Sequence, residues 1–518
     1  MKKKKKFLQL ALSGDLIESP PGGFGIFRKR EQTVLIDIVR LIRRASRHSS
    51  IDGLLLSLRH THMGWAQAEE IKSALAEMIQ CGKLVYSYLE QPGNRDFYLV
   101  SESTRVIMPP AALLDLVGLR GEVFFFRKAL DQLGVEAELF SVGRYKSAGE
   151  MFQRMSLSEA SREMLDSILS DFHSRLVASV AQRTGVAVRE AEHLIDCGPY
   201  SARKAQEKGL IDGIVYEYEL KDFAEKEVGR LHTVPAAKFK TGEGRIRRWL
   251  TFRRPQIAVI EAEGMISTGE SRRGSGRRPI LGSRTLVEQL RDARKRKRVK
   301  AVILRLNTPG GSGLASDLIW REVRLTDEKK PVIASFGNVA ASGGYYVAAA
   351  CRMILASEST LTGSIGVIGG KFNLKGLFQS LGITVDEVAK GVRAGYTSIA
   401  RPFREAEAAA FRDQLVEFYE ELFLKRVSEG RSLDPETTRA AAGGRVWTGN
   451  QAMARKLIDR IGGLLEALEA AKSEAGLSDR RTRIVIYTPR RSLRDLLPVQ
   501  MEHRLTDRIL ALAPYLPR

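Results

Sequence analysis

The segment VILRLNTPGGS, residues 302–312, joins a run of apolar residues to a turn of proline and glycine. A short apolar run bounded by turn residues is typical of a strand that is buried on both faces. A segment of the same shape, LLLSLRHTHMG, occupies residues 54–64, at an offset of 248 residues (302 minus 54). This recurrence predicts that the chain contains two copies of one folding unit.

Other parts of the chain repeat at nearly the same offset. Without a gap, an offset of 248 aligns Ser335 with Ser87, Tyr346 with Tyr98, Leu361 with Leu113, Gly366 with Gly118, Phe372 with Phe124, Leu381 with Leu133 and Gly382 with Gly134. Residues 447–462 match residues 200–215 at an offset of 247 residues. Residues 257–266 match residues 7–17 at an offset near 250 residues. We therefore predict a tandem duplication with an N-terminal half over 1–231, a basic linker over 232–254, a C-terminal half over 255–484 and a tail over 485–518.

Short apolar runs alternate with helical patterns in the second half. The strand-like runs KAVILRL, PVIASF and RMILA are separated by the helix-like segments GLASDLIWREVRL and GGYYVAAAC. This alternation predicts an α/β fold of parallel strands with crossover helices, whose ligand sites lie at the carboxyl ends of the strands. The segments NTPGGS (307–312) and GNVAASGG (337–344) both follow such ends.

Composition narrows the class of protein. The chain has 518 residues, of which 43% are hydrophobic and 28% charged, as expected for a globular protein of two domains. Three scattered cysteines offer neither a disulfide framework nor the spacing of metal ligands. The net charge of +22 comes partly from basic runs at 2–6, 245–254 and 291–300, and the absence of aromatic platforms interleaved among them argues against nucleic-acid binding.

The N-terminal residues resemble a secretion signal only superficially. The apolar stretch Phe7–Leu12 is short and is interrupted by Gln9, and no window of about 18 apolar residues occurs elsewhere. We therefore expect no membrane span. The basic runs and the apolar end RILALAPYLPR (508–518) predict peripheral attachment to an anionic membrane surface, with a cytoplasmic enzyme of basic surface as the alternative.

Ser342, in NVAASGGYYVAAAC (338–351), is the first candidate for chemistry. A serine before an apolar helix is usually an N-cap, and a nucleophilic serine needs a base. No histidine occurs from Thr233 to Glu502, so a Ser-His-Asp triad within the second half is excluded. The remaining bases are an N-terminal amine or a lysine whose pKa is lowered by burial, and Lys146 stands out because small and apolar residues surround it in SVGRYKSAGEMF.

The repeat explains why each half looks incomplete. At an offset of 248, Ser342 aligns with Asn94, and Lys146 aligns with Ala394. The glycine turn after the first strand is also present only in the second half. Each half thus retains one member of the candidate pair, which predicts one composite site per chain where the halves meet.

Four motifs carry a specific resemblance. NTPGGS, NVAASGGYYVA, LTGSIGV (361–367) and GRYKSAGEMF (143–152) closely resemble the long, duplicated form of the bacterial signal peptide peptidase A family, serine–lysine proteases with a Clp-protease/crotonase-like ββα-superhelix fold. The similarity runs from about residue 8 to residue 484. Met151 stands where the family commonly has proline, and the membrane anchor with which members usually begin is absent from this sequence.

The resemblance implies roles for particular residues. Ser342 is the nucleophile, Lys146 is the general base and later the general acid, and Ser364 orients the lysine amine. The oxyanion hole is formed by Gly343 with Gly310 or Gly311, and glycine suits this role because its backbone can approach an oxyanion closely.

The resemblance also implies an activity: hydrolysis of short, unfolded, apolar peptides, chiefly cleaved signal peptides, through an acyl-enzyme and without metal or other cofactor. It implies a homo-oligomer, a tetramer in the long form. Two alternatives remain: a coenzyme-A-dependent crotonase-type enzyme, which would need a carboxylate where Ser342 lies, and a catalytically idle oligomeric scaffold at the membrane.

Overall fold

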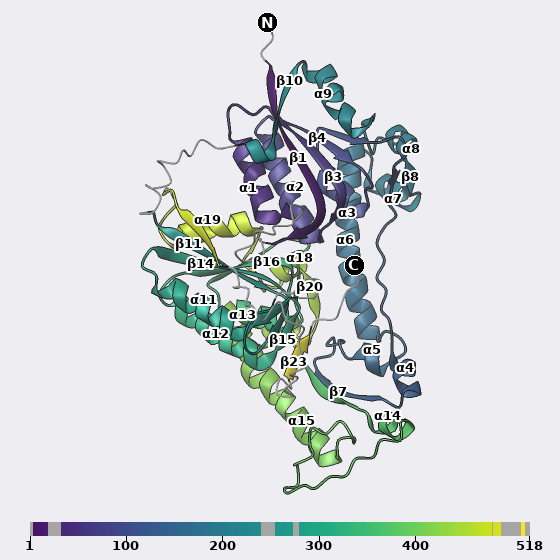
Figure 1. Ribbon diagram of the computed structural model, residues 1–518, viewed down its shortest axis with the longest axis vertical. Helices are drawn as coiled ribbons and strands as arrows, with labels where there is room; N and C mark the ends of the chain where they lie inside the picture. The colour runs from purple at the N-terminus through teal and green to yellow at the C-terminus, as the bar shows by residue number, and fades with distance from the viewer. Residues whose placement is uncertain are drawn as a thin grey trace.

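A computed structural model of the protein describes residues 4–18, 33–239, 254–272, 279–478, 480–487 and 509–512. In Figure 1 the parallel sheet of the first half lies in the upper part of the molecule, and the sheet of the second half lies below it. Helix α6 (Glu159–Thr184) runs alongside both parts, from Ser158, whose side chain caps its first turn, to Gly185 in the left-handed conformation. No helix within the described ranges is long and apolar enough to span a membrane.

The first half is built on a parallel sheet. Its strands, in spatial order, are β10 (Leu231–Pro235), β1 (Lys5–Ile17), β3 (Gly53–His62), β4 (Leu84–Leu89), β5 (Arg105–Met108) and β9 (Gly213–Ile214). The first six residues of β3 are buried, as the run at 54–58 predicts. Helices α1 (Leu35–Ser46), α2 (Trp65–Gln80) and α3 (Asn94–Val100) follow the strands as crossover elements.

The second half repeats this strand order. Its parallel strands are β22 (Arg483–Tyr487), β11 (Gln256–Glu263), β14 (Val299–Thr308), β16 (Val332–Ala341), β17 (Met353–Ala356) and β21 (Arg460–Ile461). Strand β18 (Leu361–Gly363) also pairs with β16, and β20 (Val446–Thr448) pairs antiparallel with β18. Helices α12 (Gly313–Asp327) and α13 (Gly343–Ala348) lie where the sequence predicts them. Because β14 and β3 hold the same position in the two sheets, the structure agrees with the repeat.

Apolar side chains of helices from both halves pack together where the halves meet. Ile36 of α1 lies in one buried apolar cluster with Leu464 and Leu468 of α19 (Leu464–Glu474), which covers β11 and β14. On the other side, Met164, Ile168 and Phe172 of α6 pack against Val446 of the second half. The halves therefore share apolar clusters, whose burial disfavours their separation in water.

One strand from each half joins the halves directly. Strand β7 (Glu136–Val142) pairs antiparallel with β19 (Val367–Asn373), from Val142 opposite Val367 to Glu136 opposite Asn373. Figure 1 shows this pair low in the molecule, at the end of α6. The chain that leaves β7 carries Lys146, so the pairing brings the lysine against the second half.

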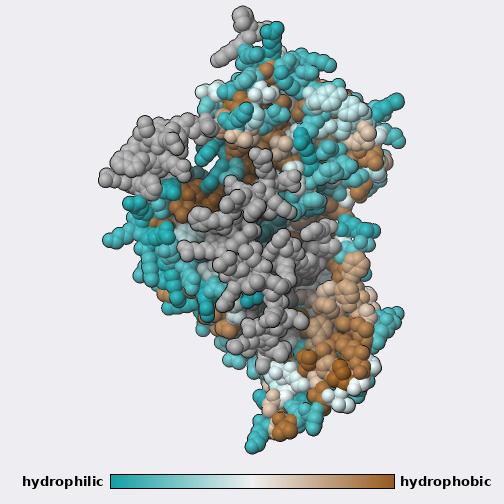
Figure 2. Space-filling model, viewed as in Figure 1, coloured by the Kyte–Doolittle hydropathy of each residue, from teal (hydrophilic) through white to brown (hydrophobic). Residues whose placement is uncertain are grey.

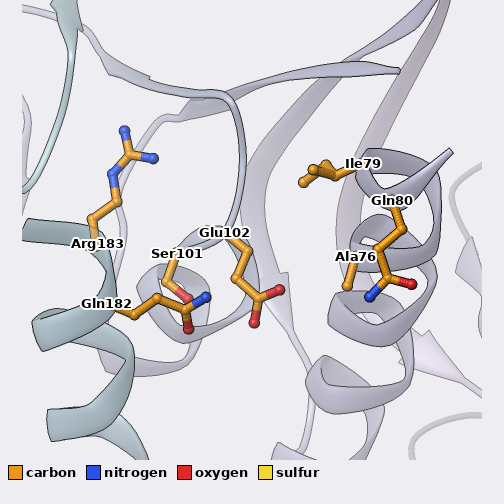
Figure 3. Close-up of a pocket in the computed structure, with 7 residues that line it drawn as sticks. All are labelled: Ala76, Ile79, Gln80, Ser101, Glu102, Gln182 and Arg183. Carbon is orange, nitrogen blue, oxygen red and sulfur yellow. The ribbon is translucent and has the colours of Figure 1, made fainter. Parts of the chain in front are cut away.

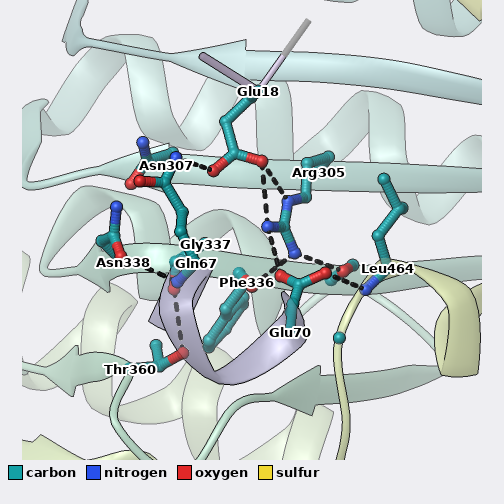
Figure 4. Close-up of polar contacts among 12 residues, drawn as sticks. Glu18, Gln67, Glu70, Arg305, Asn307, Phe336, Gly337, Asn338, Thr360 and Leu464 are labelled. Carbon is teal, nitrogen blue, oxygen red and sulfur yellow. Dashed lines mark hydrogen bonds and ion pairs between the residues drawn. The ribbon is translucent and has the colours of Figure 1, made fainter. Parts of the chain in front are cut away.

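A buried ionic cluster also links the halves (Figure 4). Arg305 of β14 is 1% exposed; its Nε donates to Glu18 Oε2 at 2.9 Å and its Nη2 to Glu70 Oε1 at 2.6 Å. Both carboxylates belong to the first half. Its remaining nitrogen, Nη1, donates to Ser335 Oγ and to Phe336 O, and Glu70 accepts the backbone N–H of Leu464. Each charge is thus hydrogen-bonded, as buried charges must be.

The sheets extend beyond two predicted boundaries. Strand β10 pairs with β1 as far as Pro235, past residue 231, and β22 reaches Tyr487, past residue 484. Lys2 and Lys3, most of the basic linker and most of the C-terminal tail lie outside the described residues, so the surface attachment expected of them stays a prediction.

Candidate active site

Ser342 lies at a sharp turn between β16 and α13. Its backbone has φ 54° and ψ −118°, a conformation that is strained for any residue other than glycine. The turn is held by its N–H, which donates to Gly363 O at 2.8 Å, and by its carbonyl, which accepts the Tyr346 N–H at 2.9 Å. Its hydroxyl makes no cap hydrogen bond to α13. The helix-cap interpretation is therefore wrong, and the buried side chain is available for another contact.

That contact is with Lys146. The amine Nζ lies 2.9 Å from Ser342 Oγ, 3.0 Å from Ser364 Oγ and 3.1 Å from Ser364 O. All three side chains are buried. Desolvation lowers the pKa of Lys146 well below its ordinary value. Among the described residues no carboxylate is hydrogen-bonded to this amine, so a neutral lysine is favoured.

The second half shapes the loop that carries the lysine. Tyr145 donates its backbone N–H to Gly443 O at 2.8 Å, and Gly444 packs so closely that a Cβ there would lie 2.5 Å from the Lys146 nitrogen. Ser364 is held from the same segment, because its N–H donates to Arg445 O at 2.7 Å. Residues 443–445 thus position both partners of Ser342. The sequence reasoning missed them, although the glycine pair in AAGGRVW was a signal.

The predicted oxyanion glycines lie beside the serine. Gly310 and Gly311 belong to β15 (Gly310–Ser312) and have φ of 103° and 152°. A Cβ on Gly343 would lie 3.3 Å from the Gly311 nitrogen and 2.5 Å from Ser316 Oγ, so the glycines pack against each other and leave no room for side chains. The Gly310 N–H already donates to Thr308 Oγ1 at 3.1 Å.

Comparison with known proteins gives the family. The model of "Peptidase family S49" matches residues 78–230 and 324–478, which together exceed half of the chain. The chain belongs to peptidase family S49. It is a protease, and the two matches, one in each half, confirm the predicted duplication of a Clp-protease-like α/β fold.

Individual relatives of this S49 protease span most of its length. It is 35% identical over 462 residues to "Serine protease SPPA, chloroplastic" of Arabidopsis thaliana, covering 88% of this chain and 68% of that protein. It is 30% identical over 493 residues to "Protease 4" of Salmonella typhi, covering 91% and 78%. Among solved structures, a ClpP1 mutant from Listeria monocytogenes aligns at 13% identity and a TM-score of 0.28, covering 43% of this chain and 99% of that one.

The equivalent positions of the first half of the S49 protease hold structural residues. Asn94 lies at the start of α3, and Ser342 directly precedes α13. The Asn94 side chain, however, accepts a hydrogen bond from the Val117 N–H and donates one to Gly118 O. Leu116, the counterpart of Ser364, is a buried core residue, and Ala394 lies in an exposed segment. The first half therefore makes no serine–lysine contact at these equivalent positions, and the contact of Lys146 with Ser342 is made between the halves.

A strand of the C-terminal tail lies next to the glycines. Strand β23 (Ile509–Leu512) pairs antiparallel with β15, Gly311 lying opposite Ala511, and also with β19. An extended segment therefore fits between these two strands, directly beside the glycine turn.

The pocket of Figure 3 is a separate feature. It lies between α2, the end of α3 and α6, and is lined by Ala76, Ile79, Gln80, Ser101, Glu102, Gln182 and Arg183. Its polar side chains have structural partners: Ser101 donates to Tyr98 O, Arg183 contacts Asp212, and Glu102 pairs with Lys72. None of the candidate catalytic residues lines it, so it is not the active site.

Proposed function

We propose that this S49 protease is a serine endopeptidase in which Ser342 is the nucleophile and Lys146 the general base. The observation that carries the proposal is the 2.9 Å contact between a buried amine from the first half and a buried hydroxyl from the second. A lysine can act as a base near neutral pH only as the neutral amine, which desolvation favours here.

The contacts suggest how the proton moves. The neutral amine of Lys146 donates two N–H groups to the hydroxyl and carbonyl oxygens of Ser364, and its lone pair accepts the hydroxyl proton of Ser342. Ser342 Oγ then attacks the scissile carbonyl carbon, and Lys146 becomes an ammonium that Ser364 stabilises. This ammonium returns its proton to the leaving amine, which leaves an acyl-enzyme. Water, deprotonated by Lys146, hydrolyses the ester and frees Ser342.

Backbone amides are suited to stabilise the tetrahedral intermediates. Gly343 follows Ser342 directly and packs against the Gly311 nitrogen, so the N–H groups of these two glycines are our preferred oxyanion donors. Gly310 is the lesser candidate because its N–H already donates to Thr308. Loss of one such donor typically costs about 3 kcal/mol of transition-state stabilisation.

The substrate that fits is an extended, apolar peptide. Pairing of β23 between β15 and β19 supports this proposal, since main-chain hydrogen bonds of the same kind would hold a substrate strand. The tail sequence Ile-Leu-Ala-Leu at 509–512 is itself apolar. Remnants of cleaved signal peptides have this character and remain our proposed substrates.

The two alternatives fit the site less well. A crotonase-type reaction needs an acid–base carboxylate, and within the described ranges no carboxylate is hydrogen-bonded to Ser342 or Lys146. A catalytically idle scaffold would gain no activity from the buried Lys146 amine and Ser342 hydroxyl, although burying a lysine costs free energy. The tetramer and the peripheral membrane attachment stay predictions.

A serine-reactive phosphonate probe tests the proposal. We expect it to modify one residue, Ser342, as located by peptide mass spectrometry, and to leave the Lys146→Ala variant unmodified. A matched control is the double variant Asn94→Ser, Ser342→Ala, which moves the hydroxyl to the equivalent position of the first half, where the repeat supplies no lysine. Modification of that control, or unchanged labelling of Lys146→Ala, would contradict the proposed dyad.

Activity should depend on pH through Lys146. Because the pKa of the folded-state amine is lowered, the inactive ammonium forms only as the pH falls through that lowered value. We therefore expect kcat/KM for an apolar peptide to rise with pH along one ionisation well below the ordinary lysine value of about 10.4, and then to level off. A profile that stays flat from about pH 4 to 10, a range that extends below the pKa of about 5–6 reached by buried lysines, would count against a lysine base.

A further inference from the structure

The loop that carries Lys146 is held against the second half by side chains as well as by backbone. Tyr145, the residue before the lysine, donates its hydroxyl to Glu163 Oε2 of α6 at 3.0 Å. Arg445 of the second half donates from its guanidinium to Glu163 Oε1, and the same guanidinium lies over the Tyr145 ring, 4.7 Å from its centroid. Arg445 thus contacts two elements of the first half, the lysine loop and α6.

Arg445 is also connected to the other members of the candidate site through the backbone. Its carbonyl accepts the Ser364 N–H at 2.7 Å. The next residue, Val446, lies opposite Gly363 in the pairing of β20 with β18, and Gly363 O accepts the Ser342 N–H at 2.8 Å. The segment that fixes the two serines therefore also carries the arginine that contacts the lysine loop.

The Arg445 side chain is confined by its contacts. It is 14% exposed, and its guanidinium also lies over the ring of Trp447, 4.5 Å from the centroid. Hydrogen bonds, first from Arg445 and then from Tyr145, lower the pKa of Glu163, so this carboxylate is charged at neutral pH. Arg144 approaches the same carboxylate only to 4.0 Å and is 67% exposed, so Arg445 is its main cationic partner. Only a guanidinium can pair with a carboxylate and stack on aromatic rings in this way.

The surface next to the lysine loop is largely apolar. The loop, residues 143–149, leads from β7 to α5 (Glu150–Gln153). Figure 2 shows hydrophobic residues gathered at the lower right, where Figure 1 places α4 (Arg127–Gln132), α5 and β7. Hydrophobic attraction is non-directional, whereas charge-assisted hydrogen bonds fix geometry. The contacts of Glu163 with Tyr145 and Arg445 are therefore suited to fix the orientation of the loop.

We propose that Arg445 is a positioning residue for the Lys146 amine. It acts through the ring of Tyr145 and through Glu163, which together fix the loop before the lysine. Within the described ranges its guanidinium makes no hydrogen bond to Lys146 or Ser342, so its effect on the chemistry is indirect. The inference rests on the proposed function, because it assigns Arg445 a part in placing the general base.

Loss of this contact would change the lysine in two ways. The side-chain groups that face the amine are the hydroxyls of Ser342 and Ser364, and desolvation alone lowers its pKa, with no contribution from a charged group. A loop that is held less firmly would displace the amine from Ser342 and let water reach it. Displacement lowers kcat, and hydration raises the pKa of Lys146 towards the ordinary lysine value of about 10.4.

The Arg445→Gln variant tests the proposal. We expect kcat for an apolar peptide to fall by about 10- to 100-fold at neutral pH, the scale of loss caused by a small misplacement of a catalytic group. KM should change little, because Arg445 lies outside the strands that are proposed to bind the substrate. The ionisation in kcat/KM should move to higher pH, so that the deficit shrinks in alkaline solution. Arg439→Gln, at an exposed ion pair with Glu420 in the same half, is the matched control and should keep the natural profile.

The Glu163→Gln variant provides a second measurement. The Glu163 side chain is 46% exposed, so its replacement leaves the core intact while removing the carboxylate that Arg445 and Tyr145 both contact. The ionisation in kcat/KM should move in the same direction as in Arg445→Gln, by a smaller amount. A purely structural contact would lower the thermal unfolding midpoint of both variants and leave the ionisation where it is.

The outcomes separate this inference from the proposed dyad. If the natural protein shows the expected ionisation and both variants keep its position, the positioning role of Arg445 is overturned and the dyad stands. A natural protein without any such ionisation would overturn the lysine base and this inference with it. A shift to higher pH in both variants, absent from Arg439→Gln, would support the positioning role.

Discussion

Replacing Lys146 by methionine is expected to lower kcat/KM for an apolar peptide by about 10⁴- to 10⁶-fold, the loss typical when a member of a nucleophile–base unit is removed. Methionine keeps the length and apolar packing of the side chain but cannot accept the Ser342 proton. Steady-state hydrolysis of a fluorogenic peptide measures the effect. The residual rate would come from the oxyanion amides and substrate binding alone.

The same substitution, Lys146→Met, should not lower the free energy of unfolding. In the folded protein the pKa of Lys146 is lowered by desolvation, whereas the unfolded chain has an ordinary lysine. Between these two pKa values the unfolded state binds more protons, so the stability of the natural protein rises with pH across that window. Methionine removes this dependence, and Lys146→Met should be at least as stable at neutral pH in thermal unfolding. Loss of activity would then be chemical and not a failure to fold.

A double variant provides the control. If Ser342 and Lys146 act as one unit, Ser342→Ala alone should lower kcat/KM about as much as the double variant Ser342→Ala, Lys146→Met. Once the serine is absent, loss of the lysine has no further effect on catalysis. Losses that multiply in the double variant would show that the two side chains act separately, which would contradict the proposed dyad.

The repeat made much of this site predictable. The strand run at 302–306 and the glycines after it set the position of the turn, and the offset of 248 showed that each half retains only one of Ser342 and Lys146. The spacing of hydrophobic residues and an internal repeat can both be recognised in a single sequence, because neither depends on which distant residues meet in the folded protein. Lys146 was therefore found 196 residues away from the serine that it contacts.

The contacts that hold the halves together gave no such signal. Arg305 interrupts a buried apolar strand, which marks it as unusual, but no period relates it to Glu18 or Glu70 in the first half. Gly444 was missed for the same reason, since its role depends on how closely the Lys146 loop approaches it. Sequence reasoning therefore fails at positions where packing against distant parts of the chain, and not the local pattern, determines the residue.

Replacing Arg305 by leucine is expected to destabilise the fold by about 3–5 kcal/mol, the cost of leaving a buried ionic partner uncompensated. Burial alone would lower the pKa of Arg305, but Glu18 and Glu70 outweigh it and hold the pKa above its ordinary value. Without the guanidinium, two carboxylates would face each other inside the protein. Chemical denaturation at neutral pH measures the loss, and Arg203→Leu, at an exposed pair with Glu207, is the matched control, with an effect of about 0–1 kcal/mol.

The pH dependence of the Arg305→Leu variant identifies the cause. Burial already raises the pKa of Glu70 despite the opposing effect of Arg305, and removal of the arginine should raise it further. A carboxyl whose folded-state pKa exceeds its unfolded value loses stability as pH rises through the folded value. The variant should therefore recover part of its stability relative to the natural protein as the pH falls from 7 towards the unfolded glutamate pKa of about 4.3. A deficit that does not change over this range would point to lost packing and not to uncompensated charge, because a cavity does not titrate.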